Sequence, residues 1–87
     1  MQITISKATT GQTITTRDAF DAYHFARELV AGDPESVVPV EAERPLVFLL
    51  QYLEEVGGYN QGTHVKWSAD AAIEQGEQLG LAVSFSE

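Results

Sequence analysis

The densest apolar stretch of the chain is residues 45–56, PLVFLLQYLEEV. On a helix its apolar side chains would cover about two-thirds of the circumference. Gln51, Glu54 and Glu55 remain as a narrow polar strip. Pro45 suits the first helical position, where its missing N–H costs nothing, and the two glycines that follow the stretch favour a C-terminal cap. We therefore predict a central helix that is covered on several sides.

The beginning of the chain alternates apolar and polar residues before it becomes helical. Residues 2–7 have the period of a half-buried strand, and after a turn residues 13–15 return as a short second strand. A first helix follows, capped by Thr15 or Thr16 and ending at Gly32. These signals predict a hairpin and then a helix.

The pattern on either side of the central helix is more broken. Residues 37–40 read as extended chain, where a proline argues for an edge position or for no strand at all. Residues 63–67 alternate as a strand, Ser68 caps a third helix through Leu79, and residues 81–85 form a last strand. The strand, helix and strand in succession form either a parallel right-handed crossover or two strands placed apart in a mixed or antiparallel sheet.

Together the elements predict an α+β fold, with three helices packed on a small mixed β-sheet of three to four short strands in the order β(β)ααβαβ. We expect a single domain over residues 1–87, because two cores would each be too small, and the chain has no cysteine for a disulfide. The longest apolar run, residues 46–50, is far too short for a membrane span, and no leader opens the chain. These features predict a cytoplasmic protein.

Acidic residues dominate the charge. Thirteen of them face five basic residues, for a net charge of −8, and all but Asp18 and Asp21 follow residue 27. Such a surface repels nucleic acid and anionic membranes and attracts basic proteins or cations. We therefore expect a basic protein partner, with no direct binding of nucleic acid and no membrane contact. Solubility is the plainer explanation of the same charge.

Motifs for catalysis or metal binding are missing. His24 and His64 have no second ligand at a spacing that suits a metal, and no serine sits in a G-x-S-x-G turn. The glycine-rich residues 57–62 lack the lysine of a phosphate-binding loop. A chain of this length could scarcely enclose a water-excluding pocket. We expect no enzyme activity, no metal and no cofactor.

Carboxylates at helical spacing are the remaining signal. Asp70, Glu74 and Glu77 stand at i, i+4 and i+7 of the third helix, about 6 Å apart along the axis. No lysine stands four residues on to pair with them. The spacing roughly resembles that of phosphates along a nucleic-acid strand, so a basic groove could accept the row. Glu54 and Glu55 on the central helix are expected to add to it.

Aromatic residues supply candidate anchors for such a contact. Phe20 and Phe25 lie at opposite margins of the first helix's apolar stripe, so one of them is left partly exposed. We select Phe25, together with Tyr59 in the glycine-rich loop, as partner-binding residues.

In size, acidity and lack of a catalytic signature the chain is similar to the small inhibitor proteins of phages and other mobile elements, including anti-CRISPR proteins and other DNA mimics. The similarity is one of profile. We therefore expect a non-enzymatic protein, monomer or homodimer, that blocks a basic, nucleic-acid-handling partner through its carboxylate rows. The alternative is a small interaction or dimerisation module whose acidity serves only solubility.

Overall fold

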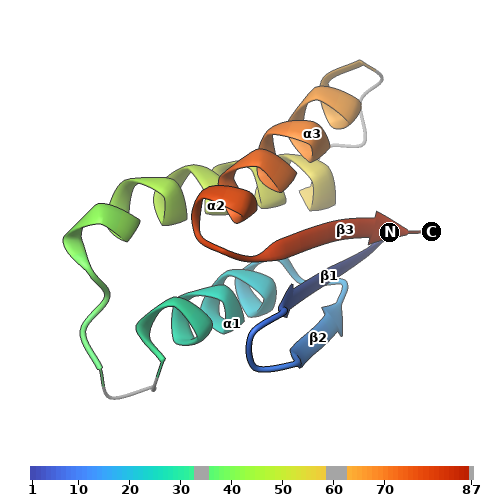
Figure 1. Ribbon diagram of the computed structural model, residues 1–87. Helices are drawn as coiled ribbons and strands as arrows, with labels where there is room; N and C mark the ends of the chain where they lie inside the picture. Colours follow the sequence, from blue (N-terminus) through green and yellow to red (C-terminus); the bar gives the residue numbers. More distant parts are fainter. Residues whose placement is uncertain (33–35, 59–62, 87) are drawn as a thin grey trace.

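The computed structural model describes residues 1–32, 36–58 and 63–86. Their order is ββαααβ, which confirms the predicted α+β class with three helices (Figure 1). The elements are β1 (Gln2–Lys7), β2 (Gln12–Thr16), α1 (Ala19–Ala31), α2 (Val40–Gly58), α3 (Thr63–Gln78) and β3 (Ala82–Ser86).

The three strands form one sheet in the order β2-β1-β3, and both strand pairs are antiparallel. The prediction of a mixed sheet is therefore corrected to an antiparallel one. The central strand β1 places Ile5 opposite Ile14 of β2 and opposite Val83 of β3, which gathers apolar side chains on one face. Gln2 pairs with Ser86, so the two ends of the chain lie side by side (Figure 1).

The predicted strand over residues 63–67 is wrong, because these residues form the beginning of helix α3. Five residues are too few to separate a period of two from a period of 3.6, and packing decides between them. Helix α3 packs against α2, and the ring of Trp67 meets the ring of Tyr52. The parallel crossover is therefore wrong, and Ser68 is a buried residue inside α3 instead of its N-cap.

Helix α1 begins at a different cap from the predicted one. Asp18 is the N-cap, and its Oδ1 accepts hydrogen bonds from the backbone N–H groups of Phe20 (2.8 Å) and Asp21 (3.2 Å). A carboxylate satisfies two free donors of the first turn and also suits the positive end of the helix. The helix ends at Gly32, as predicted, in a left-handed conformation with φ of +82°.

Helix α2 begins at Val40, more than one turn before the predicted start at Pro45. Pro45 therefore lies inside the helix, where it leaves the carbonyl of Glu41 without its usual helical donor. Glu41 is exposed to water, whereas Ala42 is buried in the core. Ala42 is thus the residue of this first turn that packs into the core.

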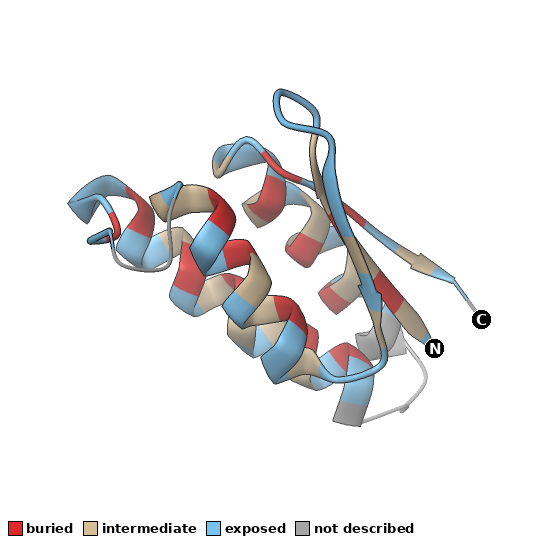
Figure 2. Cartoon of the chain, turned by 90° about the horizontal axis from the view of Figure 1, so that it is seen from below, coloured by how far each residue is buried: buried red, intermediate tan, exposed pale blue. Residues whose placement is uncertain are grey.

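The core lies between the sheet and the helices. Helices α1 and α3 contact the sheet, and α2 packs against both of these helices. Leu49 and Leu53 of α2 are 0% exposed, as is Ile5 of the central strand. In Figure 2 the buried positions recur along the helices and along the strands. One side of α2 and one side of α3 are left facing solvent, and that is where the candidate site lies.

Candidate partner-binding surface

The three carboxylates predicted on the third helix share its solvent side. Asp70, Glu74 and Glu77 are all exposed, whereas Ser68 and Ala72 of the same helix are 0% exposed. At 100° per residue the three acidic positions point almost opposite to the buried ones. Helix α3 therefore presents one outward row of negative charge, which we call the α3 acidic row.

The two carboxylates predicted on the central helix do not extend this row. Glu54 lies on the same side of α2 as Glu43 and Val47. Glu43 and Val47 line a hollow between α2 and α1. Glu55 points toward α3, where its carboxylate accepts a hydrogen bond from the hydroxyl of the buried Ser68. Glu54 is thus on a different side of the molecule, and Glu55 already has a partner within the fold.

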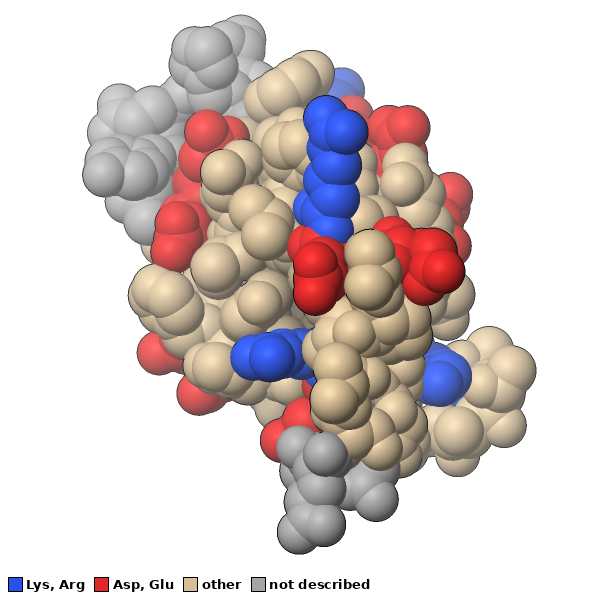
Figure 3. All heavy atoms as spheres, turned by 90° about the vertical axis from the view of Figure 1, so that its left-hand side faces the viewer, with Lys and Arg blue, Asp and Glu red and all other residues tan. Residues whose placement is uncertain are grey.

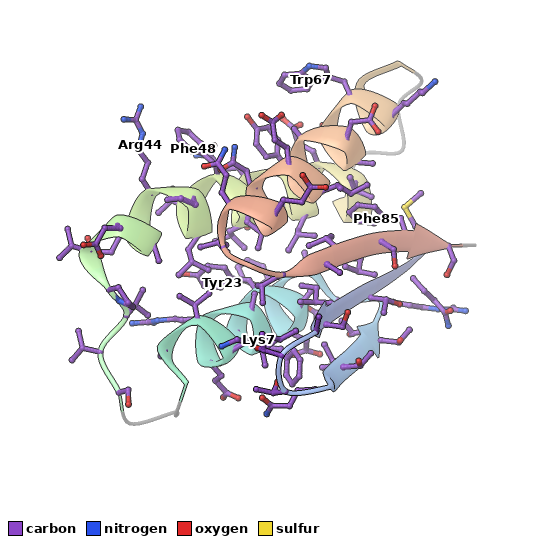
Figure 4. The ribbon with its side chains drawn as sticks, viewed as in Figure 1. Lys7, Tyr23, Arg44, Phe48, Trp67 and Phe85 are labelled. Carbon is purple, nitrogen blue, oxygen red and sulfur yellow. The ribbon has the colours of Figure 1, made fainter. Side chains whose placement is uncertain are left out.

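Aromatic and basic side chains lie on the outer side of α2 and near the beginning of α3 (Figure 4). Trp67 is 60% exposed, and Tyr52 meets its ring at a centroid distance of 5.6 Å and an interplanar angle of 86°. Further along α2, the guanidinium carbon of Arg44 lies 5.5 Å from the centroid of the Phe48 ring. Figure 4 shows Arg44, Phe48 and Trp67 on the same outer side of the molecule, away from the sheet.

These side chains of two helices define what we call the α2–α3 surface. It consists of Arg44, Phe48, Tyr52, Trp67 and the α3 acidic row. Tryptophan, tyrosine and arginine are the residue types most often found to dominate binding energy at protein interfaces. The arrangement combines aromatic side chains with negative charge.

The aromatic anchors differ from those predicted. Phe25 is only partly exposed and packs against the core, and Phe20 at the opposite margin is 53% exposed. Tyr59 lies outside the described residues. Trp67 was missed because its stretch was assigned to a strand. A helical reading would have placed it one turn before Asp70, on the solvent side of α3.

Chemical groups for catalysis are not gathered in the described residues. None of their His, Asp and Glu side chains form a cluster that could hold a metal ion. His24 is exposed and its ring lies 5.5 Å from that of Tyr23, while the side chain of His64 lies outside the described part of the chain. Three hollows lined by described residues are open to solvent.

Charge on the side of the molecule shown in Figure 3 is mixed. Acidic side chains lie there in several separate places, with lysine and arginine side chains among them. The excess of acid is therefore not collected into one patch on that side. The α3 acidic row, by contrast, follows a single helix.

Neither a membrane span nor a relative adds to this picture. In the described ranges, no helix has both the length and the apolar character needed to cross a bilayer. Comparison of the chain with protein-family models, with curated proteins and with solved structures finds no match.

Proposed function

We propose that this chain is a non-enzymatic acidic binding protein that blocks a basic, nucleic-acid-handling protein, in the manner of phage and mobile-element inhibitors such as anti-CRISPR proteins and DNA mimics. The observation that carries the proposal is the exposed row of Asp70, Glu74 and Glu77 beside the exposed ring of Trp67. The row offers charge to a groove built for phosphates, and the ring offers an apolar anchor. We place the encounter in the cytoplasm.

The first test reverses the charge of the α3 acidic row. The variant Asp70→Lys/Glu74→Lys/Glu77→Lys should keep its fold, because all three side chains are exposed, and should lose the partner that the unmodified chain captures from a host lysate. The matched control, Asp21→Lys/Glu28→Lys/Glu43→Lys, makes the same change of charge at exposed positions of α1 and α2.

Capture by both variants would show that the α3 acidic row is not the contact. Loss with both variants would show that net charge alone matters, and the specific surface would have to be abandoned. Only loss with the α3 variant and retention with the control supports the proposal.

Mimicry needs a second measurement on the captured partner. If the chain occupies a nucleic-acid groove, its addition should release a labelled duplex or single strand from that partner. A partner that holds the chain and its nucleic acid together would rule out mimicry and leave simple protein binding.

A protein-interaction or dimerisation module is the second candidate function. It is favoured by exposed apolar residues at the start of α2, where Val40 is 78% exposed and Val47 is 51% exposed. Salt separates the two functions. Binding through the acidic row should weaken steeply as salt rises, because exposed charges are screened within about 8 Å at physiological ionic strength. Association through the valines should be indifferent to salt or strengthened by it.

A further inference from the structure

Exposed valines gather at the beginning of α2. Val40 and Val47 are seven residues apart, so they lie on the same side of the helix, and they are 78% and 51% exposed. Val37, just before the helix, is 89% exposed. We call these three residues the valine patch. Apolar side chains held in water favour association with a surface that covers them.

A hollow between α1 and α2 adjoins the valine patch, because Val47 belongs to both. Figure 4 shows Tyr23 of α1 in the space between the two helices. Val38 and Leu46 contribute buried apolar surface to the hollow. Its full lining is Tyr23, Arg27, Val38, Glu43, Leu46 and Val47. The valine patch and this hollow together form what we call the α1–α2 face.

The hollow carries one charge of each sign. Arg27 lies on α1 and Glu43 lies on α2, and both side chains are exposed. They are the two charged residues among the described residues that line the hollow. Helix α3 differs, because its exposed row consists of acids. Two α3 acidic rows would repel each other, whereas a base and an acid on one face can pair with the same two residues of a second copy.

Two-fold symmetry would match these charges without any further requirement. In a two-fold dimer both copies use the same surface, so a contact of one residue with another occurs twice. An axis that runs between α1 and α2, parallel to them, would place α1 of one copy over α2 of the other. Arg27 of each copy would then face Glu43 of the other copy. The same arrangement would let α1 of each copy cover valines on α2 of the other.

The α1–α2 face is separate from the α3 acidic row. Helix α3 contacts α2 and β3, and among the described residues it makes no contact with α1. A dimer formed through the α1–α2 face therefore does not need the acidic row. Like charges on α3 would be kept out of the contact between the two copies.

We infer that two copies of this chain associate through the α1–α2 face, with Arg27 of each copy paired with Glu43 of the other. The inference gives a surface and a charge pairing to the dimerisation named as the second candidate function. It does not depend on the α3 acidic row, and a dimer of this kind would carry two such rows.

The test exchanges the two charges and follows association of the full chain by analytical ultracentrifugation. The unmodified chain should form a dimer whose population rises with concentration. Arg27→Glu places acid against acid, and Glu43→Arg places base against base. Each variant alone should therefore raise the dissociation constant of the dimer at least about tenfold. An equimolar mixture of the two variants should regain the dimer, because both contacts then join opposite charges.

Matched controls separate this pairing from net charge and from folding. Arg17→Glu and Asp21→Arg make the same two changes of charge at exposed positions outside the hollow, and each should dimerise like the unmodified chain. Val47→Ser leaves the charge unchanged and should weaken the dimer by about tenfold through lost apolar contact. Circular dichroism checks that every variant is folded.

Several results would overturn the inference. These are an unmodified chain that stays monomeric at every concentration, and a mixture of Arg27→Glu with Glu43→Arg that associates no better than either variant alone. A third is an equal effect of the two control substitutions, which would assign association to net charge. Loss of partner capture by a monomeric Val47→Ser chain would assign the face to the partner instead.

Partner capture keeps this inference apart from the proposed function. Arg27→Glu should still capture the partner as a monomer, and the variant with a reversed α3 acidic row should still dimerise. If the dimer is absent but reversal of the row abolishes capture, the proposed function stands without it. If the dimer forms but reversal of the row has no effect on capture, the dimer stands and the inhibitor proposal fails.

Discussion

Gly76 of α3 and Val83 of β3 are packed so closely that a methyl group on residue 76 would overlap Cγ2 of Val83. Both residues are buried, and the overlap involves a branched side chain held in the core. The glycine thus sets the distance at which α3 lies against the sheet. The same distance sets the position of the α3 acidic row relative to the sheet. It also shapes the hollow that residues of α3 and β3 line together.

Gly76→Ala should therefore destabilise the fold. Overpacking costs about 1–3 kcal/mol and alanine regains about 1 kcal/mol of helix propensity, so we expect a net loss of about 1 kcal/mol in the free energy of unfolding. Urea unfolding followed by circular dichroism measures it. Gly57→Ala is the control, because Gly57 also lies in a helix but has nothing within 4 Å of an added Cβ, and it should stabilise slightly. Equal effects at the two glycines would contradict the packing argument.

Substitution of Glu55 and substitution of Ser68 should lower the free energy of unfolding by unequal amounts. Ser68 is 0% exposed, and its hydroxyl donates to the carboxylate of Glu55, which is exposed. Glu55→Ala leaves the buried hydroxyl without this partner and should cost about 1–3 kcal/mol, whereas after Ser68→Ala the carboxylate can turn to water at a cost of about 1 kcal/mol. The control is Gln51→Ala, because Gln51 is exposed and lies on α2, the helix that carries Glu55. Thermal unfolding of the four proteins gives the order, and a larger loss for Ser68→Ala would contradict it.

Periodicity alone was enough for much of the fold. The alternation around Ile3 and Ile5, the apolar stripe of the first helix and the long apolar stretch after Pro45 are each long or regular enough to fix an element type. Residues 63–67 are too few to fix an element type, because five residues fit a strand and a helix equally well. The packing of helix α3 on α2 is the context that the local sequence lacks.

The candidate site was predictable where it depends on a single helix. Asp70, Glu74 and Glu77 share one side of α3 because the spacing of the helix requires it. The neighbours of that row come from α2, and no local pattern predicts which residue of one helix meets which residue of another. The contacts of Tyr52 with Trp67 and of Glu55 with Ser68 are therefore results of the structure alone.

The cap of helix α1 offers a further test of local sequence against structure. Asp18→Ala removes the acceptor for two backbone N–H groups and should cost about 1 kcal/mol. Asp18→Asn keeps an acceptor and should cost much less. Thr15→Ala, at the alternative cap position, should have a small effect, since the described contact of the Thr15 side chain is an exposed hydrogen bond to Thr4. A larger loss for Thr15→Ala than for Asp18→Ala in urea unfolding would show that the cap has been assigned wrongly.

Trp67 should matter far more for binding than for folding. With 60% of its surface exposed, Trp67→Ala should lower the free energy of unfolding by only about 1 kcal/mol, most of it from the lost contact with Tyr52. At a binding hot spot the same substitution should cost about 2 kcal/mol or more of binding free energy. Phe20→Ala is the control, because Phe20 is 53% exposed and lies on α1, away from the α2–α3 surface.

The readout for this last prediction is built into the chain, because Trp67 is its one tryptophan. Emission from the free protein should be that of an indole in contact with water and should be quenched readily by acrylamide. Binding of the partner should shift the emission to shorter wavelength and protect it from the quencher, and Phe20→Ala should not alter either change. If the partner binds with full affinity while the emission and the quenching stay the same, then the contact lies elsewhere on the molecule and the α2–α3 surface is not the site.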